Sequence, residues 1–235
     1  MGRKKLAKKK KVVERAEEKR KIDPVLLLGG LLLLAVLVSI FRGTSGDGGS
    51  QVDEPPMANV PGEYTLFQNM PNTHEPGRVQ MIVFFDFFCP HCHNFDTGLL
   101  PQLEAKYGSQ LVVTPVGFPI FGTKAVNALR AHEIAKDFGK GGEMSLAIFD
   151  AYHNKGMDIS DTAVLAAIAG DVGLDTEQFK RALDSGAKIE IIRGNVGFGN
   201  SYNVRQTPTV LLDGQYVVTK ISLENIDEII SGLLA

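Results

Sequence analysis

The fold is decided by the stretch FFDFFCPHC at residues 84–92, in which an apolar segment runs directly into two cysteines three positions apart. The run Val79–Phe85 is strongly apolar and predicts a buried strand. The residues from about 91 to 107 predict a helix with a kink at Pro101. The strand therefore delivers Cys89 to the first turn of a helix.

Cys89 and Cys92 are the two cysteines of the chain, so they are expected to act together. A zinc knuckle would need a second ligand pair, and the sequence has neither another C-x-x-C nor an H-x₃₋₅-H. Covalent haem attachment uses C-x-x-C-H, which His93 completes, but such motifs belong to small helical domains. Dithiol–disulfide chemistry suits the strand-to-helix position best. A carrier of a soft metal such as copper, using both cysteines and a histidine, stays open as an alternative.

The local chemistry favours a reactive thiolate at Cys89. The free N–H groups and the positive dipole end of the helix stabilise a negative sulfur there. Pro90 at the first helical position lacks an N–H and presets the helical φ, and His91 can add positive charge or a hydrogen bond. We therefore expect the Cys89 pKa to fall from about 8.5 toward roughly 3.5–7.5, with Cys89 as the nucleophile and Cys92 as the resolving thiol.

The folded part, about residues 61–235, predicts an α/β or α+β fold with a mainly helical insertion. Extended segments are expected at Tyr64–Gln68 and Leu111–Val116. The insertion covers about 123–200, with helices expected at Ala125–Phe138, Met144–His153, Thr162–Val172 and Glu177–Gly194. A hairpin turning at Asp213-Gly214 and an amphipathic helix then close the chain, and the inward face of that helix carries Ile226, Ile229 or Ile230, and Leu233.

The chain resembles DsbA-type proteins of the thioredoxin superfamily in three features. The strand and C-P-H-C motif at residues 84–92 are similar to that family's active-site region. Further along the chain, Thr207-Pro208-Thr209 stands where the family has its cis-proline loop, and the helical block matches its insertion. The resemblance covers about 61–235. It implies a thioredoxin-like fold, a cis Pro208 beside the Cys89 sulfur, and a Thr207 backbone that is free to pair with an extended substrate segment.

The sequence departs from this family at one position. The family often has a buried acid six residues before the first cysteine, which is thought to manage the proton of the second thiol, and here that residue is Val83. Asp86 is nearer the motif, but strand alternation does not guarantee it the same face. Asp96, four residues after Cys92, matches an acidic position near the family's active site or is a solvated helix residue. The sequence alone therefore does not assign the proton handling.

The remaining histidines have simpler interpretations. His93 is expected to face solvent on the helix, with metal binding as the alternative. His132 and His153 lie in helical stretches and are expected at the surface or at helix caps, and His74 lies in a polar loop. Aromatic residues next to Cys89 are mostly expected in the core. An apolar substrate surface is a further hypothesis, formed by some of them with Phe118, Pro119 and Phe121.

The N-terminal part predicts a membrane anchor. Residues 1–24 carry eleven Lys or Arg against four Asp or Glu, whereas the remainder carries fourteen against twenty-three. An acidic body with a basic tail is not typical of a nucleic-acid binder. Residues 25–41 are free of charge and reach the short end of what spans a bilayer. A long basic segment precedes them and Ile40-Phe41-Arg42 stands where a cleavage site would be, so an uncleaved anchor is favoured over a signal peptide.

The charge asymmetry also predicts the topology and the activity. The positive-inside rule places residues 1–24 in the cytoplasm and the body outside, on a flexible tether at 42–60. We expect a membrane-anchored thiol–disulfide oxidoreductase that oxidises extracytoplasmic protein thiols through a mixed disulfide at Cys89. No cofactor is expected beyond the Cys89–Cys92 disulfide. The expected partners are thiol-bearing substrate proteins, the lipid bilayer and a membrane protein that reoxidises the dithiol. A reductase or isomerase on the same fold is the first alternative.

Overall fold

The structure is a computed structural model that describes residues 60–235. The basic tail predicted at 1–24, the membrane span predicted at 25–41 and all but the last residue of the tether at 42–60 lie outside the described residues. Between residues 60 and 235, no helix has the length and apolar character that crossing a bilayer requires.

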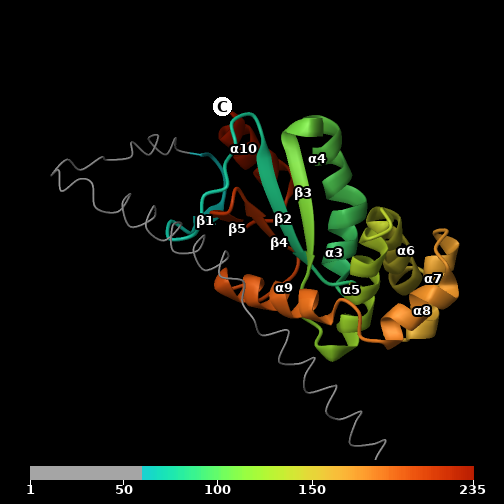
Figure 1. Ribbon diagram of the computed structural model, residues 1–235. Coiled ribbons are helices and arrows are strands. Elements are labelled where there is room, and N and C mark those ends of the chain that lie inside the picture. The colour runs from blue at the N-terminus through green and yellow to red at the C-terminus, as the bar shows by residue number, and fades with distance from the viewer. Residues whose placement is uncertain (1–59) are drawn as a thin grey trace, which may run out of the picture. The chain divides into compact units, whose positions relative to one another are not determined.

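A five-stranded mixed sheet forms the first layer of the fold (Figure 1). Its strands are β1 (Tyr64–Leu66), β2 (Val79–Phe85), β3 (Leu111–Gly117), β4 (Thr209–Leu212) and β5 (Tyr216–Val218). They lie in the order β1-β5-β4-β2-β3, in which β2 and β3 are parallel and the other neighbours are antiparallel. The strand predicted at Val79–Phe85 is confirmed to the residue. It has neighbours on both sides, which explains why its sequence is almost wholly apolar.

The hairpin predicted at Asp213-Gly214 joins β4 to β5. Asp213 has φ 45° and Gly214 has φ 74°, so both lie in the left-handed region that a type I′ turn requires. A side chain at Gly214 would also collide with the Pro71 carbonyl. Because β4 starts at Thr209, this hairpin fixes the preceding proline loop at the end of the sheet.

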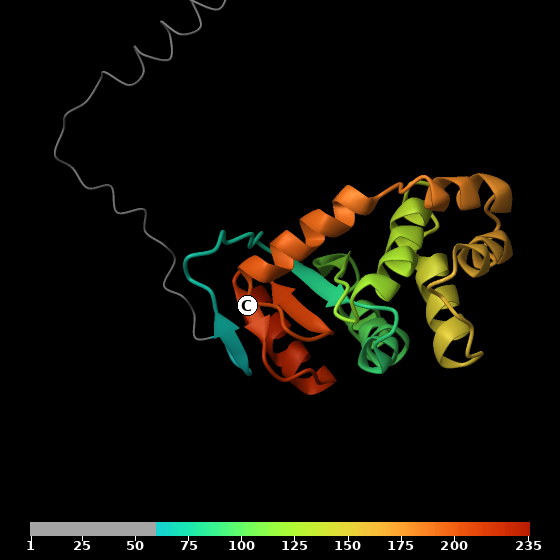
Figure 2. The ribbon, with the colours of Figure 1, turned by 90° about the horizontal axis from the view of Figure 1, so that it is seen from below.

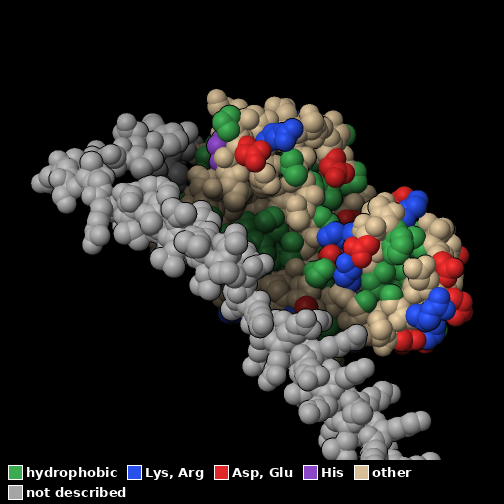
Figure 3. Space-filling view, in the orientation of Figure 1, with side chains coloured by type: hydrophobic (Ala, Val, Ile, Leu, Met, Phe, Trp, Pro, Cys, Tyr) green, Lys and Arg blue, Asp and Glu red, His purple; other side chains and the backbone are tan. Residues whose placement is uncertain are grey.

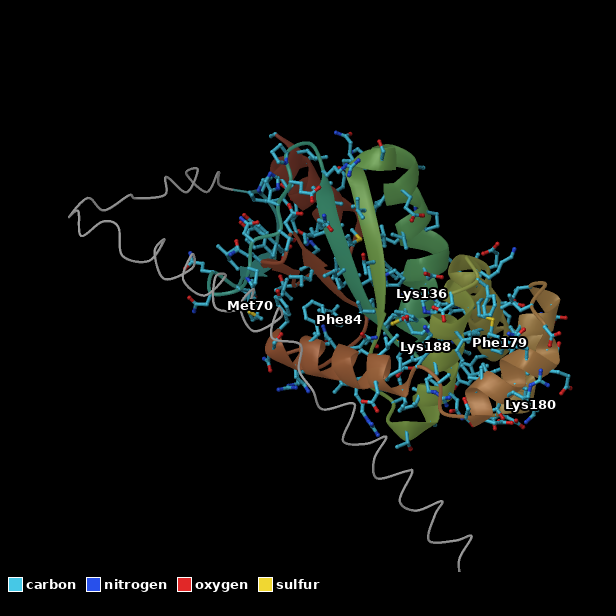
Figure 4. The ribbon with its side chains drawn as sticks, in the orientation of Figure 1. Met70, Phe84, Lys136, Phe179, Lys180 and Lys188 are labelled. Carbon is cyan, nitrogen blue, oxygen red and sulfur yellow. The ribbon has the colours of Figure 1, made fainter. Side chains whose placement is uncertain are left out.

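Helices cover both faces of the sheet because the side chains of β2 alternate between them. On one face, Met81 and Val83 belong to a core shared with α4 (Leu100–Tyr107) and α10 (Leu223–Leu234). The inward face predicted for the last helix is confirmed, with three isoleucines buried and Leu233 half-buried. On the other face Phe84 packs near α9 (Ile189–Ser201), beneath an apolar hollow (Figures 3 and 4).

The helix predicted at 91–107 is one helical run with a change of winding in its middle. It consists of α3 (Pro90–Asn94), a π-helical turn at Phe95–Leu99, and α4. In the π turn the Leu100 N–H donates to the carbonyl of Phe95, five residues earlier. Pro101 follows directly. A proline has no N–H to donate, and its ring clashes with the carbonyl four residues earlier in a regular α-turn. The predicted kink therefore takes the form of a widened turn.

The insertion between β3 and β4 contains five helices. The first four extend away from the sheet, and the fifth, α9, returns along it (Figure 2). They are α5 (Thr123–Lys136), α6 (Gly141–His153), α7 (Thr162–Asp171), α8 (Thr176–Asp184) and α9. The single helix predicted at 177–194 is wrong. The chain breaks between α8 and α9, where Gly186 and Lys188 have φ 84° and 66°. The Ala187 N–H closes α8 by donating to the carbonyl of Ala182, as in a Schellman motif.

The helix α5 lies at the centre of the insertion, and each residue from Ala128 to Ala135 is buried. Its alanines leave room for neighbouring helices to approach closely. The core built around α5 also contains Phe87, Phe88 and both cysteines. The insertion therefore packs directly against the turn that carries the C-x-x-C motif.

Candidate active site

Cys89 and Cys92 lie at the start of α3, where the strand meets the helix. Cys89 is the N-cap residue, and its sulfur accepts the backbone N–H of Cys92 at 3.4 Å. The Cys89 thiol in turn donates to the carbonyl of Thr207 at 3.2 Å. Cys89 is 4% exposed and Cys92 is 2% exposed, and both are free thiols. Two nearly buried thiols therefore share one turn of helix.

The pKa values of the two thiols shift in opposite directions. The pKa of Cys89 is lowered from 9.0 to about 5, first by the hydrogen bond from the Cys92 thiol. The Thr207 side chain and the N–H groups of Cys92 and His91 lower it further, against the effect of burial. Burial raises the pKa of Cys92, and the hydrogen bond to Cys89 raises it further. A Cys89 thiolate beside a protonated Cys92 is the state that this arrangement favours at neutral pH.

Pro90 and His91 occupy the positions that the sequence predicts for them. Pro90 is at the first turn of α3, where its missing N–H leaves no partner unsatisfied. Both side chains are exposed. The backbone N–H of His91 is among the groups that lower the pKa of Cys89. The His91 side chain lies at the surface beside the motif, where it lines a groove.

The loop at Thr207-Pro208 lies against the cysteine turn, and its peptide bond is cis, the isomer that the resemblance implies. The Thr207 hydroxyl is buried, has no hydrogen-bond partner in the described part of the chain and lies near both sulfurs. A groove of about 440 Å³ runs beside this loop. Its lining includes His91, Phe95, Leu99, Thr207, Pro208 and Ile221. This groove has room for an extended chain next to Cys89.

Asp86 lies fully buried three residues before Cys89. Its carboxylate accepts the N–H of Phe88 at 2.9 Å with one oxygen and the N–H of Phe121 at 3.1 Å with the other. Burial raises the pKa of this carboxyl, against the two backbone hydrogen bonds, and the nearby Cys89 raises it further. Asp86 therefore joins the cysteine turn to the loop after β3. The lone charge within FFDFF is the sequence signal for such a buried carboxylate.

His153 lies at the end of its helix, as one of its two expected placements has it, but its side chain points toward the active-site turn, which the sequence does not predict. His153 lies in the last turn of α6 and its Nε2 is 2.9 Å from the carbonyl of Phe87. Its ring stacks on that of His93, with centroids 4.8 Å apart and planes 4° apart. Burial lowers the pKa of His153. His93 is likewise half-buried rather than facing solvent, and no sequence spacing announces this pairing across 60 residues of chain.

His132 is also misplaced by the sequence, since it is 2% exposed. The helix α5 is buried on nearly all sides, so an amphipathic interpretation fails for it. The ring of His132 packs edge-on against Phe85 and Phe87. Asp96, which the sequence leaves undecided, lines a cavity together with Cys92 and His132. His74 lies in its predicted loop, with Nδ1 2.8 Å from the buried Asp213 carboxylate.

The apolar loop after β3 lies close to the motif, as the substrate-surface hypothesis requires. Phe118 is buried, whereas Phe121 is 44% exposed and Ile120 is 37% exposed. The Lys124 ammonium lies 4.6 Å from the ring centre of Phe88 and 5.4 Å from that of Phe121. An apolar surface with one cation therefore adjoins the residue before Cys89.

The metal-carrier alternative needs a cluster of metal ligands. Between residues 60 and 235, no three His, Cys, Asp or Glu side chains are arranged to hold a metal ion. His93, the residue that completes the C-x-x-C-H pattern, stacks on His153. The arrangement present is a pair of thiols beside a proline loop.

A mixed sheet with helices on both faces, a C-x-x-C pair at a helix start and a cis-proline beside its first sulfur together define a dithiol protein of the thioredoxin fold. The chain belongs to the DSBA-like thioredoxin domain family, whose model matches residues 80–231. It is a protein thiol–disulfide oxidoreductase. The predicted thioredoxin-like fold with a helical insertion is thereby confirmed.

Two relatives illustrate the similarity. The thiol:disulfide interchange protein DsbA of Haemophilus influenzae is 26% identical over 159 residues, which are 64% of this chain and 73% of the relative. That of Pseudomonas syringae pv. tomato is 27% identical over 142 residues, or 60% of this chain and 65% of the relative.

Solved structures agree on the fold. The oxidoreductase DsbA from Xylella fastidiosa matches with a TM-score of 0.62 and 22% identity, over 72% of this chain and 94% of that one. BdbD from Bacillus subtilis, in its oxidised form, matches with a TM-score of 0.62 and 17% identity, over 74% of this chain and 97% of that one.

Proposed function

We propose that this oxidoreductase works as an oxidase that forms disulfides in extracytoplasmic proteins. A client thiolate attacks Cys89 of the Cys89–Cys92 disulfide, a client–Cys89 bond forms, and Cys92 leaves with the electron pair and takes a proton. A second client thiolate then attacks the client sulfur of this mixed disulfide. The client leaves with a disulfide, and the enzyme keeps two electrons as the Cys89 thiolate and the Cys92 thiol.

The observation that carries the oxidase direction is the low pKa of Cys89, about 5. A thiolate that is stable at neutral pH stabilises the reduced enzyme, and this makes its disulfide a stronger oxidant. A low pKa also makes Cys89 a good leaving group when the client disulfide forms. The groove beside Thr207 and Pro208 supports a role for these two residues in holding the client chain.

The sequence supports a membrane setting for this reaction. We propose that residues 25–41 anchor the protein with residues 1–24 in the cytoplasm, and that residues 42–60 tether the catalytic part outside. After each turnover an oxidase holds two electrons taken from its client, and it must pass them to an acceptor before it can oxidise another. The proposal therefore includes a membrane redox partner that reoxidises the dithiol, and the anchor would hold the two proteins close together.

The reduction potential of the Cys89–Cys92 couple tests the direction of electron flow. We expect a value near the −120 mV of a strongly oxidising dithiol, whereas one near −270 mV, as in thioredoxin, would support a reductase. Equilibration of the protein with glutathione buffers, followed by alkylation and mass measurement, gives this potential. A reducing value would replace the oxidase by the reductase or isomerase alternative on the same fold.

Trapping tests the mechanism and identifies the clients. In Cys92→Ala the Cys89 thiolate can attack a client disulfide, so that one client sulfur leaves as a thiolate and the other stays bonded to Cys89. This mixed disulfide has no Cys92 thiol to resolve it, so clients should accumulate on the protein as reducible adducts. The matched control is Cys89→Ala, which retains one thiol of the pair but lacks the proposed nucleophile. Adducts on the control and none on Cys92→Ala would reverse the assigned roles.

A further inference from the structure

One lysine beside the cysteine turn lacks the carboxylate partner that the other lysines have. Residues 60–235 contain eight lysines, and seven of them form an ion pair with an aspartate or a glutamate. The eighth is Lys124, which lies exposed in the first turn of α5. Among the described residues, no carboxylate lies within ion-pair distance of its ammonium. The charge of Lys124 is therefore available to a molecule that binds there.

Aromatic rings hold Lys124 in place instead of a carboxylate. Its Nζ lies 4.6 Å from the ring centre of Phe88 and 5.4 Å from that of Phe121, within the range of a cation–π interaction. Phe88 is buried and packs against the ring of Tyr152, whereas Phe121 is 44% exposed. Because Phe88 directly precedes Cys89, the ammonium is held one residue away from the proposed nucleophile.

The start of α5 adds to the positive potential at this place. Its N-cap residue, Gly122, has no side chain to accept the free N–H groups, and the first turn carries no acidic residue. The buried carboxylate of Asp86 interacts with Lys124 through space, but its two oxygens already accept the N–H groups of Phe88 and Phe121. A free ammonium beside an uncapped helix start attracts a negative group from outside.

This positive surface is separate from the groove proposed to hold the client chain. That groove is lined by α3 and by the loop with Thr207 and Pro208, and no residue of α5 or of the loop before it lines the groove. Cys89 therefore adjoins two surfaces. An extended chain advances about 3.3 Å per residue, so a client whose cysteine meets Cys89 needs only a few more residues to reach Lys124.

We propose that Lys124 selects clients that carry an acidic side chain within a few residues of their reactive cysteine. This inference rests on the proposed dithiol–disulfide exchange and adds the class of client that the site prefers. The client carboxylate would supply the ion pair that the described part of the chain does not. The preference has to be local, because residues 25–235 carry fourteen basic against twenty-three acidic residues and their overall field repels an acidic client.

Lys124 acts on the client rather than on the thiolate. The low pKa of Cys89 comes from hydrogen bonds to its sulfur, first that from Cys92 and then those from Thr207 and the helix N–H groups. Replacing Lys124 should therefore change which client reacts fastest and leave the titration of Cys89 in place.

Single-turnover oxidation of peptides tests this selection. Reduced peptides with two cysteines, identical except for Glu, Gln or Lys at one position, are mixed with the oxidised protein, quenched with acid and weighed by mass spectrometry. Two sets place the variable residue before or after the first cysteine. We expect the second-order rate in one set to fall in the order Glu, Gln, Lys, with Glu about threefold faster than Gln, the worth of one exposed ion pair. Salt at about 1 M should bring this ratio toward one.

Two variants and a matched control connect the preference with Lys124. Lys124→Met keeps an unbranched stem over Phe88 and removes the charge, so the ratio of the Glu to the Gln peptide should fall to about one. Lys124→Glu should invert the order, so that the Lys peptide reacts fastest. The control is Lys180→Met, which makes the same change of net charge on α8, in the far part of the insertion (Figure 4), where Lys180 pairs with Asp184. It should keep the wild-type ratio.

Three results would overturn the inference. The wild-type protein could show no preference for the Glu peptide in either set, Lys124→Met could retain the preference, or Lys180→Met could lose it equally. A loss of rate by one common factor for all peptides, with a raised Cys89 pKa in Lys124→Met, would also overturn it, because Lys124 would then act on the thiolate. A wild-type protein that oxidises none of the peptides would instead overturn the proposed function and this inference with it, so the two failures are distinguishable.

Discussion

Cys89 and Cys92 are one helical turn apart, yet they belong to different parts of the molecule. Cys89 faces the end of the sheet, where Thr207 and the first N–H groups of α3 contact its sulfur. Cys92 faces inward and shares a cavity with His132 of the insertion. The first environment lowers a thiol pKa and the second raises one. The comparison shows that hydrogen-bond donors and burial can set opposite chemistry on neighbouring residues.

The same contrast separates the two parts of the fold. The cysteine turn itself and the proline loop supply the contacts that make Cys89 reactive. The insertion supplies the apolar surroundings of Cys92, together with the two histidines, His132 and His153, that reach the motif. The insertion is therefore part of the active site as well as its cover.

The largest effects are expected when the cysteines are replaced one at a time, which tests whether Cys89 and Cys92 have different roles. Cys89→Ser should lower the rate of oxidation of a reduced two-cysteine peptide by at least about 10³-fold, because serine cannot form the Cys89–Cys92 disulfide that accepts the two electrons. Cys92→Ser should still form a mixed disulfide at Cys89 when glutathione disulfide is supplied, because the Cys89 thiolate displaces one glutathione thiolate. Mass spectrometry detects this adduct. Equal losses of adduct formation in the two variants would contradict the assignment.

The second prediction concerns pH. The folded, reduced protein lowers the Cys89 pKa from 9.0 to about 5. The Cys89 thiolate therefore stabilises the reduced protein fully above about pH 9. This stabilisation is lost as the pH falls from 9 toward 5. Allowing for solvent screening at the helix end, the loss should be on the order of 3 kcal/mol. Urea unfolding of the reduced protein at several pH values measures it.

The oxidised protein is the control for this pH series, because its disulfide has no thiolate to titrate. The difference in unfolding free energy between the two redox forms should shrink as the pH falls from 9 toward 5. A difference that stays constant over this interval would mean that the Cys89 pKa is not lowered in the fold.

The third prediction sharpens the link between the two thiols. The largest cause of the low Cys89 pKa is the hydrogen bond from Cys92. Cys92→Ala removes this donor and should raise the Cys89 pKa by about one to two units, the equivalent of one hydrogen bond to a charged group. Cys92→Ser keeps a donor and should raise it less. Thiolate absorbance near 240 nm follows the titration, and equal values for the two variants would exclude the hydrogen bond as the cause.

Much of this arrangement could be predicted from the sequence, because its signals are local. The apolar run of β2, the C-P-H-C motif and the Asp213-Gly214 turn each announce their own structure within a few residues. The cis-proline loop and the insertion were accessible through the family resemblance. The predicted helix at 177–194 did not include the break between α8 and α9, which lies at Gly186, where a positive φ ends the first helix.

The surroundings of the second thiol could not be predicted, because they depend on tertiary packing. His132 and His153 lie far along the chain from Cys92, and a single sequence carries no sign of which helix face meets the motif. Alanine-rich α5 looks like a surface helix by composition, yet its small side chains allow it to be surrounded. Sequence reasoning therefore described Cys89 well and left the environment of Cys92 undetermined.

The smallest expected effect comes from His153, which contacts the turn from outside the pair. Its Nε2 bonds the Phe87 carbonyl two residues before Cys89, and its ring stacks on His93. His153→Ala should cost about 1 kcal/mol of unfolding free energy, the usual worth of one such hydrogen bond. His153→Gln can still donate to that carbonyl and should cost less. The hydrogen bond from His153 holds the backbone carbonyl of Phe87 rather than the Cys89 sulfur, so the Cys89 pKa should change little in either variant. A large rise in that pKa would show that His153 acts on the thiolate itself.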